Sequence, residues 1–190
     1  MWRSLLYVPG DRVSELLGKA VDSHAEAIIL DLEDAVAPAA KSTARDLVAA
    51  SIDSVPRSKG VVVRVNSDDA LSDDLDAIDG HAIGLMLPKA TASLLDRLDR
   101  ELATRGTPDR PVIALVESAQ GILDLPRIAA HRLVHRIAIG EADLRADLGL
   151  SERAEQSLWA IRTQVVVASA AHRLAKPIGP VATDFRDLET

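Results

Sequence analysis

Two carboxylates stand where the sequence could hold a divalent metal ion. Glu117 closes an apolar run at 112–116, and Asp143 follows another at 136–139. If these runs are neighbouring strands of a parallel sheet, about 4.8 Å apart, the two carboxylates converge on one ion. Ligation by oxygen alone suits Mg²⁺, which keeps positions for water or substrate. The alternative is structural, with Glu117 capping the next helix or pairing with an arginine.

A charged residue inside an apolar strand is a candidate substrate contact. Arg64 lies within VVVRVN, where a buried charge is costly unless a partner neutralises it. Its guanidinium could hold a substrate carboxylate through two parallel hydrogen bonds. The partner could instead be internal, from the DLED segment at 31–34, in which Asp31 and Glu33 point to the same side. Glu33 could then position Arg64, a water molecule or the metal.

Other cations have competing interpretations. Lys89 after Pro88 is either a Schiff-base lysine or the ion-pair partner of a nearby acid, and pairing is the favoured interpretation. Arg3 precedes an apolar strand with little structural reason to be cationic, which makes it a candidate for substrate binding. Lys41 and Arg45 either contact a cofactor phosphate or are ordinary solvated residues.

The elements that would position these residues alternate between strand and helix. Apolar runs predict strands at 5–8, 27–30, 61–65, 84–87, 112–116 and 136–139, with a weaker one at 176–181. Apolar residues at helical spacing predict helices over 13–21 and 94–102. The strands lack polar alternation, as strands do when helices cover a parallel sheet.

Polar residues follow nearly every predicted strand, which favours a (β/α)₈ barrel. The alternative, a doubly wound sheet, gathers its chemistry at one switch point and often has a glycine-rich loop after the first strand. Here that position reads VPGD. We therefore expect an α/β protein of the TIM-barrel type that forms a single domain over residues 1–190 and lacks its last βα unit.

Composition excludes several classes of protein. The 190 residues are 47% hydrophobic and 27% charged, which is incompatible with intrinsic disorder. With no cysteine, there is no disulfide, thiolate nucleophile or sulfur-ligated metal. A net charge of -7 and an aromatic content of 2% argue against nucleic-acid binding. No apolar run approaches the roughly 20 residues of a membrane span, so we expect a cytoplasmic protein.

Six motifs occur together in one order: RSLLYVPGD, AIILDLEDAV, VVVRVN, GLMLPKA, VIALVESAQGI and IAIGEADLRADLG. In this order they resemble the citrate lyase beta-subunit-like branch of the HpcH/HpaI aldolase family. Members are Mg²⁺-dependent (β/α)₈ barrels, usually trimers or hexamers, that cleave or form carbon–carbon bonds in 3-hydroxyacyl-CoA thioesters such as citryl-CoA, malyl-CoA and citramalyl-CoA.

The resemblance also implies roles for individual residues. Glu117 and Asp143 correspond to the Mg²⁺ ligands, with Glu117 close to the substrate, and Arg64 to the contact for the oxo-acid carboxylate. Arg3 falls near the CoA side of the site. Beyond ATDFRDLE the family continues through a helix, an eighth strand and an extension that in several members supplies a catalytic acid, and the sequence does not extend that far.

The leading hypothesis is therefore a lyase that converts a CoA thioester into an oxo-acid and acetyl-CoA. A class II aldolase acting on free hydroxy acids fits less well, because RSLLYVPGD offers no histidine base. A thioester hydrolase is a further alternative. The remaining one is a non-catalytic or partner-dependent subunit that binds metal and oxo-acid.

Overall fold

The strands form one parallel sheet in chain order. The computed structural model describes residues 2–81, 83–151 and 155–182. Within these ranges the sheet contains β1 (Leu5–Pro9), β2 (Ala27–Asp31), β3 (Gly60–Arg64), β4 (Gly84–Leu87), β5 (Val112–Val116) and β6 (Val134–Ile139). Each strand pairs in parallel with the next. A doubly wound sheet would reverse its strand order at a switch point, so the observed order is of the barrel type.

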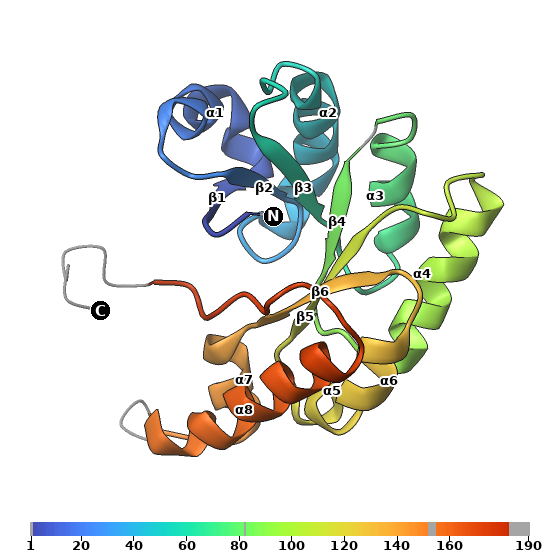
Figure 1. Ribbon diagram of the computed structural model, residues 1–190. Coiled ribbons are helices and arrows are strands. Elements are labelled where there is room, and N and C mark those ends of the chain that lie inside the picture. The colour runs from blue at the N-terminus through green and yellow to red at the C-terminus, as the bar shows by residue number, and fades with distance from the viewer. Residues whose placement is uncertain (1, 82, 152–154, 183–190) are drawn as a thin grey trace.

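The helices lie along the outer side of the curved sheet (Figure 1). They are α1 (Val13–Asp22), α2 (Lys41–Ile52), α3 (Leu71–Ala77), α4 (Ala92–Thr104), α5 (Ala119–Leu123), α6 (Leu125–Ala130), α7 (Glu141–Asp147) and α8 (Glu155–Ala171). Two 3-10 turns, η1 (Gly10–Arg12) and η2 (Pro38–Ala40), precede α1 and α2. None of the helices in the described ranges is long and apolar enough to cross a membrane.

Apolar side chains fill both faces of the sheet. One cluster lies between sheet and helices and includes Leu30, Val63 and Leu95. A second, on the inner face, comprises Ile29, Val62, Met86, Ile113, Leu115 and Ala138. Successive residues of a strand point to opposite faces, so burial on both faces requires an unbroken apolar run. This explains why the strands lack polar alternation.

The two helices predicted from apolar spacing form with slightly wider bounds, as α1 and α4. Thr91 caps α4 by accepting a hydrogen bond from the backbone of Leu94 at 3.2 Å. After α4, Gly106 adopts a φ of +72°, a conformation that suits glycine at a helix end.

The predicted strand at 176–181 was wrong. The structure has there one isolated parallel bridge, between Ala138 and Ile178. Pro177 and Pro180 lie on either side of Ile178, and a proline has no N–H with which to extend a ladder. The preceding strand, β6, begins at Val134, two residues earlier than predicted.

Candidate active site at the carboxyl ends of the strands

An ion pair joins the carboxyl ends of β2 and β3. Arg64 and Asp31 are register partners, and the guanidinium donates from Nε to Asp31 Oδ1 at 2.7 Å and from Nη2 to Oδ2 at 2.5 Å. Asp31 is fully buried and also accepts the backbone N–H of Glu33. Burial works against the Arg64 cation, but the hydrogen bond and charge of Asp31 raise its pKa above the ordinary value. Arg64 is therefore a permanent, oriented cation.

Glu33 links this pair to β4. Its Oε2 lies 3.0 Å from Arg64 Nη1, and its Oε1 accepts a hydrogen bond from Lys89 Nζ at 2.7 Å. Burial raises the pKa of Glu33, and the hydrogen bond from Lys89 partly offsets this. The same hydrogen bond raises the pKa of Lys89. Lys89 is thus an ion-pair partner with a stabilised proton, the opposite of what a Schiff-base lysine requires.

Glu117 lies in a tight space between β4 and β6. It is 4% exposed, and its Oε1 accepts the backbone N–H of Lys89 at 2.7 Å. A Cβ atom on Gly140, just after β6, would lie 2.3 Å from Glu117 Oε2 and 2.7 Å from Glu117 Cβ. Glycine is therefore needed at position 140 for the carboxylate to fit. Burial, with a smaller contribution from the charge of Asp143, raises the pKa of Glu117 to about 7.

Asp143 lies in the first turn of α7 and is exposed. Its effect on Glu117 places the two acids close enough to interact electrostatically. In the described part of the chain, no three His, Cys, Asp or Glu residues form a metal-binding group. A cation held here by two carboxylates would take its other ligands from water or substrate, which fits the chemistry of Mg²⁺.

Arg3 does not join this cluster. Its side chain is 90% exposed and pairs with Glu26, and both residues precede strands that they flank. They therefore lie at the amino edge of the sheet, a full strand length from Arg64. The cationic residue before β1 thus has a structural partner, and the structure does not bring Arg3 together with the residues at the carboxyl edge.

Lys41 and Arg45 stabilise the segment after β2 rather than a phosphate. Lys41 Nζ donates to the backbone oxygens of Leu32 and Glu33, both at 2.6 Å, and to Asn66 Oδ1 at 2.8 Å. Asn66 donates to the buried carboxylate of Asp74, which in turn accepts from Arg45 Nε at 2.8 Å. This network holds in place the backbone that carries Glu33.

Tyr7 was not singled out from the sequence, because a tyrosine in an apolar strand resembles any other core residue. Its ring centroid lies 5.1 Å from Arg64 Cζ, and its hydroxyl donates to Met86 Sδ at 3.1 Å. Burial raises the pKa of Tyr7 to about 12. The uncharged ring of Tyr7 thus packs against the guanidinium. The one sequence signal that could have indicated this contact is the place of a tyrosine near the carboxyl end of a predicted strand.

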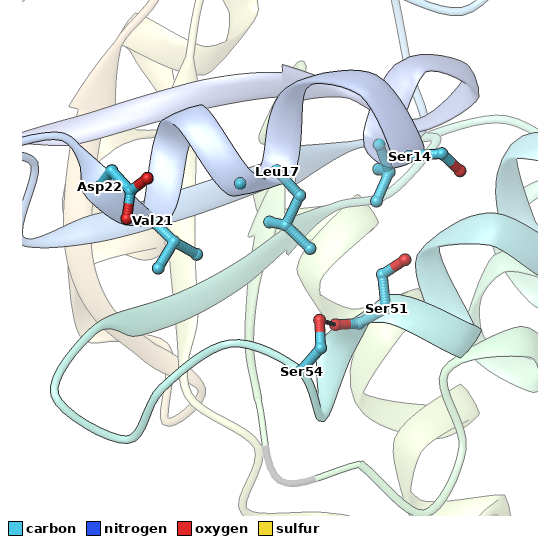
Figure 2. A pocket seen from close by; sticks show the side chains of 8 residues that line it. Ser14, Leu17, Val21, Asp22, Ser51 and Ser54 are labelled. Carbon is cyan, nitrogen blue, oxygen red and sulfur yellow. Dashed lines mark hydrogen bonds between the residues drawn. The ribbon is translucent and has the colours of Figure 1, made fainter.

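A hollow of about 370 Å³ lies away from this cluster, between α1 and the end of α2 (Figure 2). The side chains around it include Ser14, Leu17, Val21, Asp22, Ser51 and Ser54. The Ser54 hydroxyl donates to the backbone oxygen of Ser51 at 2.6 Å. The buried charged groups described above are instead at the carboxyl edge of the sheet.

Fold and site together define a barrel-type α/β protein with a partly buried arginine and buried carboxylates at the carboxyl edge of its strands. The family model for HpcH/HpaI aldolase/citrate lyase matches residues 3–190. The chain belongs to this family.

Relatives with known names match nearly all of the chain. A (3S)-malyl-CoA thioesterase of Cereibacter sphaeroides is 35% identical over 193 residues, which cover 99% of this chain and 66% of the relative. A citrate lyase subunit beta-like protein of Mycobacterium tuberculosis is 36% identical over 194 residues, which cover 97% of this chain and 66% of the relative. The chain therefore spans just under two thirds of the length of these relatives.

Solved structures match in the same way. The citrate lyase beta subunit of M. tuberculosis, complexed with oxaloacetate and magnesium, superposes with a TM-score of 0.81 at 32% identity, covering 98% of this chain and 82% of that one. A protein of the same organism in complex with magnesium, acetoacetate and coenzyme A superposes with a TM-score of 0.79 at 32% identity, covering 97% of this chain and 67% of that one.

Proposed function

We propose that this chain is a Mg²⁺-dependent carbon–carbon lyase that cleaves or forms a 3-hydroxyacyl-CoA thioester, with an oxo-acid and acetyl-CoA as the other pair of reactants. The observation that carries the proposal is the contact of one residue, Lys89, with both Glu117 and Glu33, which brings the metal-ligating and arginine-bearing parts of the site together. The relatives support it, since solved neighbours hold magnesium with oxaloacetate or with acetoacetate and coenzyme A.

In this proposal each group of the site has a distinct role. Arg64, held by Asp31, binds the carboxylate of the oxo-acid half, and the substrate competes with Glu33 for Nη1. Glu117 and Asp143 hold Mg²⁺, which when bound supplies a Lewis acid for the substrate carbonyl oxygen. Catalysis is then chiefly positioning and electrostatic stabilisation by groups that are already in place.

Proton transfer is assigned to Glu33. In the cleavage direction the 3-hydroxyl group loses its proton, the bond between C2 and C3 breaks, and the thioester enolate takes up a proton to become acetyl-CoA. Glu33 has a pKa raised by burial and lies beside the arginine that holds the substrate, so it is suited to carry a proton at this point.

Thioester hydrolysis is the second candidate function, and the names of the 34–35% identical relatives favour it. Malyl-CoA distinguishes the two reactions. A lyase releases glyoxylate and acetyl-CoA, whereas a thioesterase releases malate and free CoA. The chain contains no cysteine, so a thiol reagent reports free CoA without background from the protein.

The first experiment is calorimetric titration of oxaloacetate, pyruvate and glyoxylate with Mg²⁺ and with EDTA, followed by the malyl-CoA assay. Asp143→Ala should abolish metal-dependent binding and turnover. Asp46→Ala, which removes an exposed carboxylate on α2, is the matched control. Sustained turnover in Asp143→Ala or in EDTA would refute the proposal, and binding without turnover would support the non-catalytic subunit.

We propose further that the chain assembles into a trimer or hexamer. Along β1, no second strand pairs with the free edge among the described residues, and such an edge favours association. Light scattering coupled to size exclusion measures the mass directly, and a monomer at high protein concentration would contradict this assembly.

A further inference from the structure

A second hollow lies at the opposite edge of the sheet from the proposed active site. It has a volume of about 1270 Å³ and is lined by the loops that lead into β3, β4 and β5. Trp2 contributes to its wall and packs so closely on Gly60 that a Cβ atom there would lie 2.1 Å from the indole. The proposed function uses none of these residues.

Arg110 is the unusual residue of this hollow. It is 8% exposed and donates from Nη2 to the backbone oxygen of His81 at 3.2 Å. Among the described residues, no carboxylate lies within ion-pair distance of it, and Asp79 acts on it only at longer range. Its remaining N–H groups have no protein acceptor in the described part of the chain.

Other partly buried arginines of the described chain have more partners for their positive charge than Arg110 has. Arg64, Arg45 and Arg105 are each paired with carboxylates. Arg136 has no carboxylate partner among the described residues, but it donates to the backbone oxygens of both Trp2 and Lys176. Arg110 combines deep burial with one hydrogen bond, and a buried cation without a counter-ion is costly. Burial lowers the pKa of Arg110, which is the expected effect of an uncompensated charge.

The surrounding walls indicate what kind of anion would fit. Apolar side chains form one part of them, among them Trp2, Val55, Pro56, Ile83, Pro108 and Pro111, and charged side chains form another, namely Asp53, Arg57, Lys59 and Asp109. The loop before β5 also contains the Thr107 hydroxyl, which is buried without a hydrogen-bond partner among the described residues. A hollow of this composition suits a ligand with one charged end and an apolar body, because small-molecule sites pair apolar walls with few polar groups.

We propose that this hollow binds a small aliphatic carboxylate, whose carboxylate pairs with Arg110 and whose hydrocarbon part lies against Trp2 and the neighbouring prolines. The site is separate from the carboxyl edge, where Arg64 and Glu117 lie. The inference therefore does not depend on the proposed function, and either can fail without the other.

Trp2 provides a direct reporter for this binding. The chain has two tryptophans, and Trp159 on α8 is 64% exposed, so Trp159→Phe leaves Trp2 as the sole fluorescent tryptophan at little structural cost. In this background we expect hexanoate to change Trp2 emission in a saturable way and to raise Tm, at an ionic strength held constant with sodium chloride.

Arg110→Met should weaken hexanoate binding by more than about tenfold, since it removes the paired charge. Without ligand, this variant should melt at the same or a higher temperature than its parent, because the uncompensated cation is gone. The matched control is Arg57→Met, which removes an exposed arginine from the same hollow and should bind hexanoate normally.

Three results would overturn the proposal. One is the absence of a saturable response to hexanoate in Trp159→Phe. The second is an equal response in Arg110→Met. The third is a response to inorganic phosphate that hexanoate does not produce, which would show that the hollow selects a different anion. A lower melting temperature of ligand-free Arg110→Met would contradict the argument that the charge is uncompensated.

Discussion

Replacing Gly140 by alanine tests the geometry of the metal site. The added Cβ atom would lie 2.3 Å from Glu117 Oε2 and 2.7 Å from Glu117 Cβ, both far inside normal contact distance. The carboxylate end could rotate away, but the Cβ atom of Glu117 cannot. The backbone offers little relief, because Gly140 N donates to the oxygen of Val116 at 3.0 Å. Accommodation therefore requires β5 and β6 to separate locally or Glu117 to shift.

The size of the effect follows from this overlap. Overpacking of this kind costs about 1–3 kcal/mol of folding free energy. Mg²⁺ affinity should fall about 10–100-fold, the range typical when the surroundings of a metal ligand are disturbed. Gly18→Ala is the matched control, since its added Cβ would have no atom within 4 Å other than those of its own helix backbone and chain neighbours, and the residue is in the interior of α1. It should stabilise the chain by about 0.5–1 kcal/mol.

Guanidinium denaturation in EDTA measures the stability of both variants, and calorimetric titration with Mg²⁺ and oxaloacetate measures the affinity. If Gly140→Ala matches the parent chain in both, Glu117 does not occupy the space described and the metal site is placed wrongly. If Gly18→Ala is as disruptive as Gly140→Ala, the loss reflects a general intolerance of alanine at glycine positions.

Three further changes test the contacts around this site. Arg64→Met leaves the buried Asp31 unpaired and should lower the free energy of unfolding by about 3–5 kcal/mol in denaturation experiments. The double variant with Asp31→Asn should recover part of this loss. Unchanged stability of Arg64→Met would contradict the ion pair. Lys41→Met leaves the backbone oxygens of Leu32 and Glu33 without their donor, and should cost about 1–3 kcal/mol and accelerate amide exchange after β2, whereas Lys41→Arg should restore part of the protection. Because burial raises the pKa of Glu117 from 4.5 to about 7, the metal-free folded chain binds this proton more tightly than the unfolded chain does. Its stability in EDTA should therefore fall as pH rises from about 4.5 through about 7, and Glu117→Gln should flatten this slope.

The fold was largely predictable because most of its strands are buried on both faces. All five residues of β2 are buried, and the same holds for β5, so the unbroken apolar runs mark them directly. The segment around Ile178 was wrongly predicted to be a strand because it contains apolar residues. The prediction did not take into account that the neighbouring prolines lack the backbone N–H groups that a strand needs for pairing. Strand order followed from chain order, since each βα unit places the next strand beside the last.

The gathering of candidate side chains at one edge was predictable where a residue lies at or just after the end of a strand. Glu33, Arg64 and Glu117 reach the same edge because parallel strands end together. Arg3 lies apart from these residues, because a residue that precedes β1 lies at the other edge of the sheet. The roles of Lys41 and Tyr7 depend on contacts across 25 and 79 residues, and no local spacing encodes such contacts.

The pairing of strands in chain order also affects how this molecule can fold. Every strand pair joins consecutive βα units, so each loop closure along the sheet is short and the sheet can grow from the first unit onward. The hydrogen bond from Arg136 to Trp2 spans 134 residues and stands apart from this pattern. It joins the beginning of the chain to β6, the last strand of the described residues. Because it joins residues so far apart in the chain, we expect this contact to form after the local strand pairs, and a variant that lacks this guanidinium should form its sheet at the normal rate.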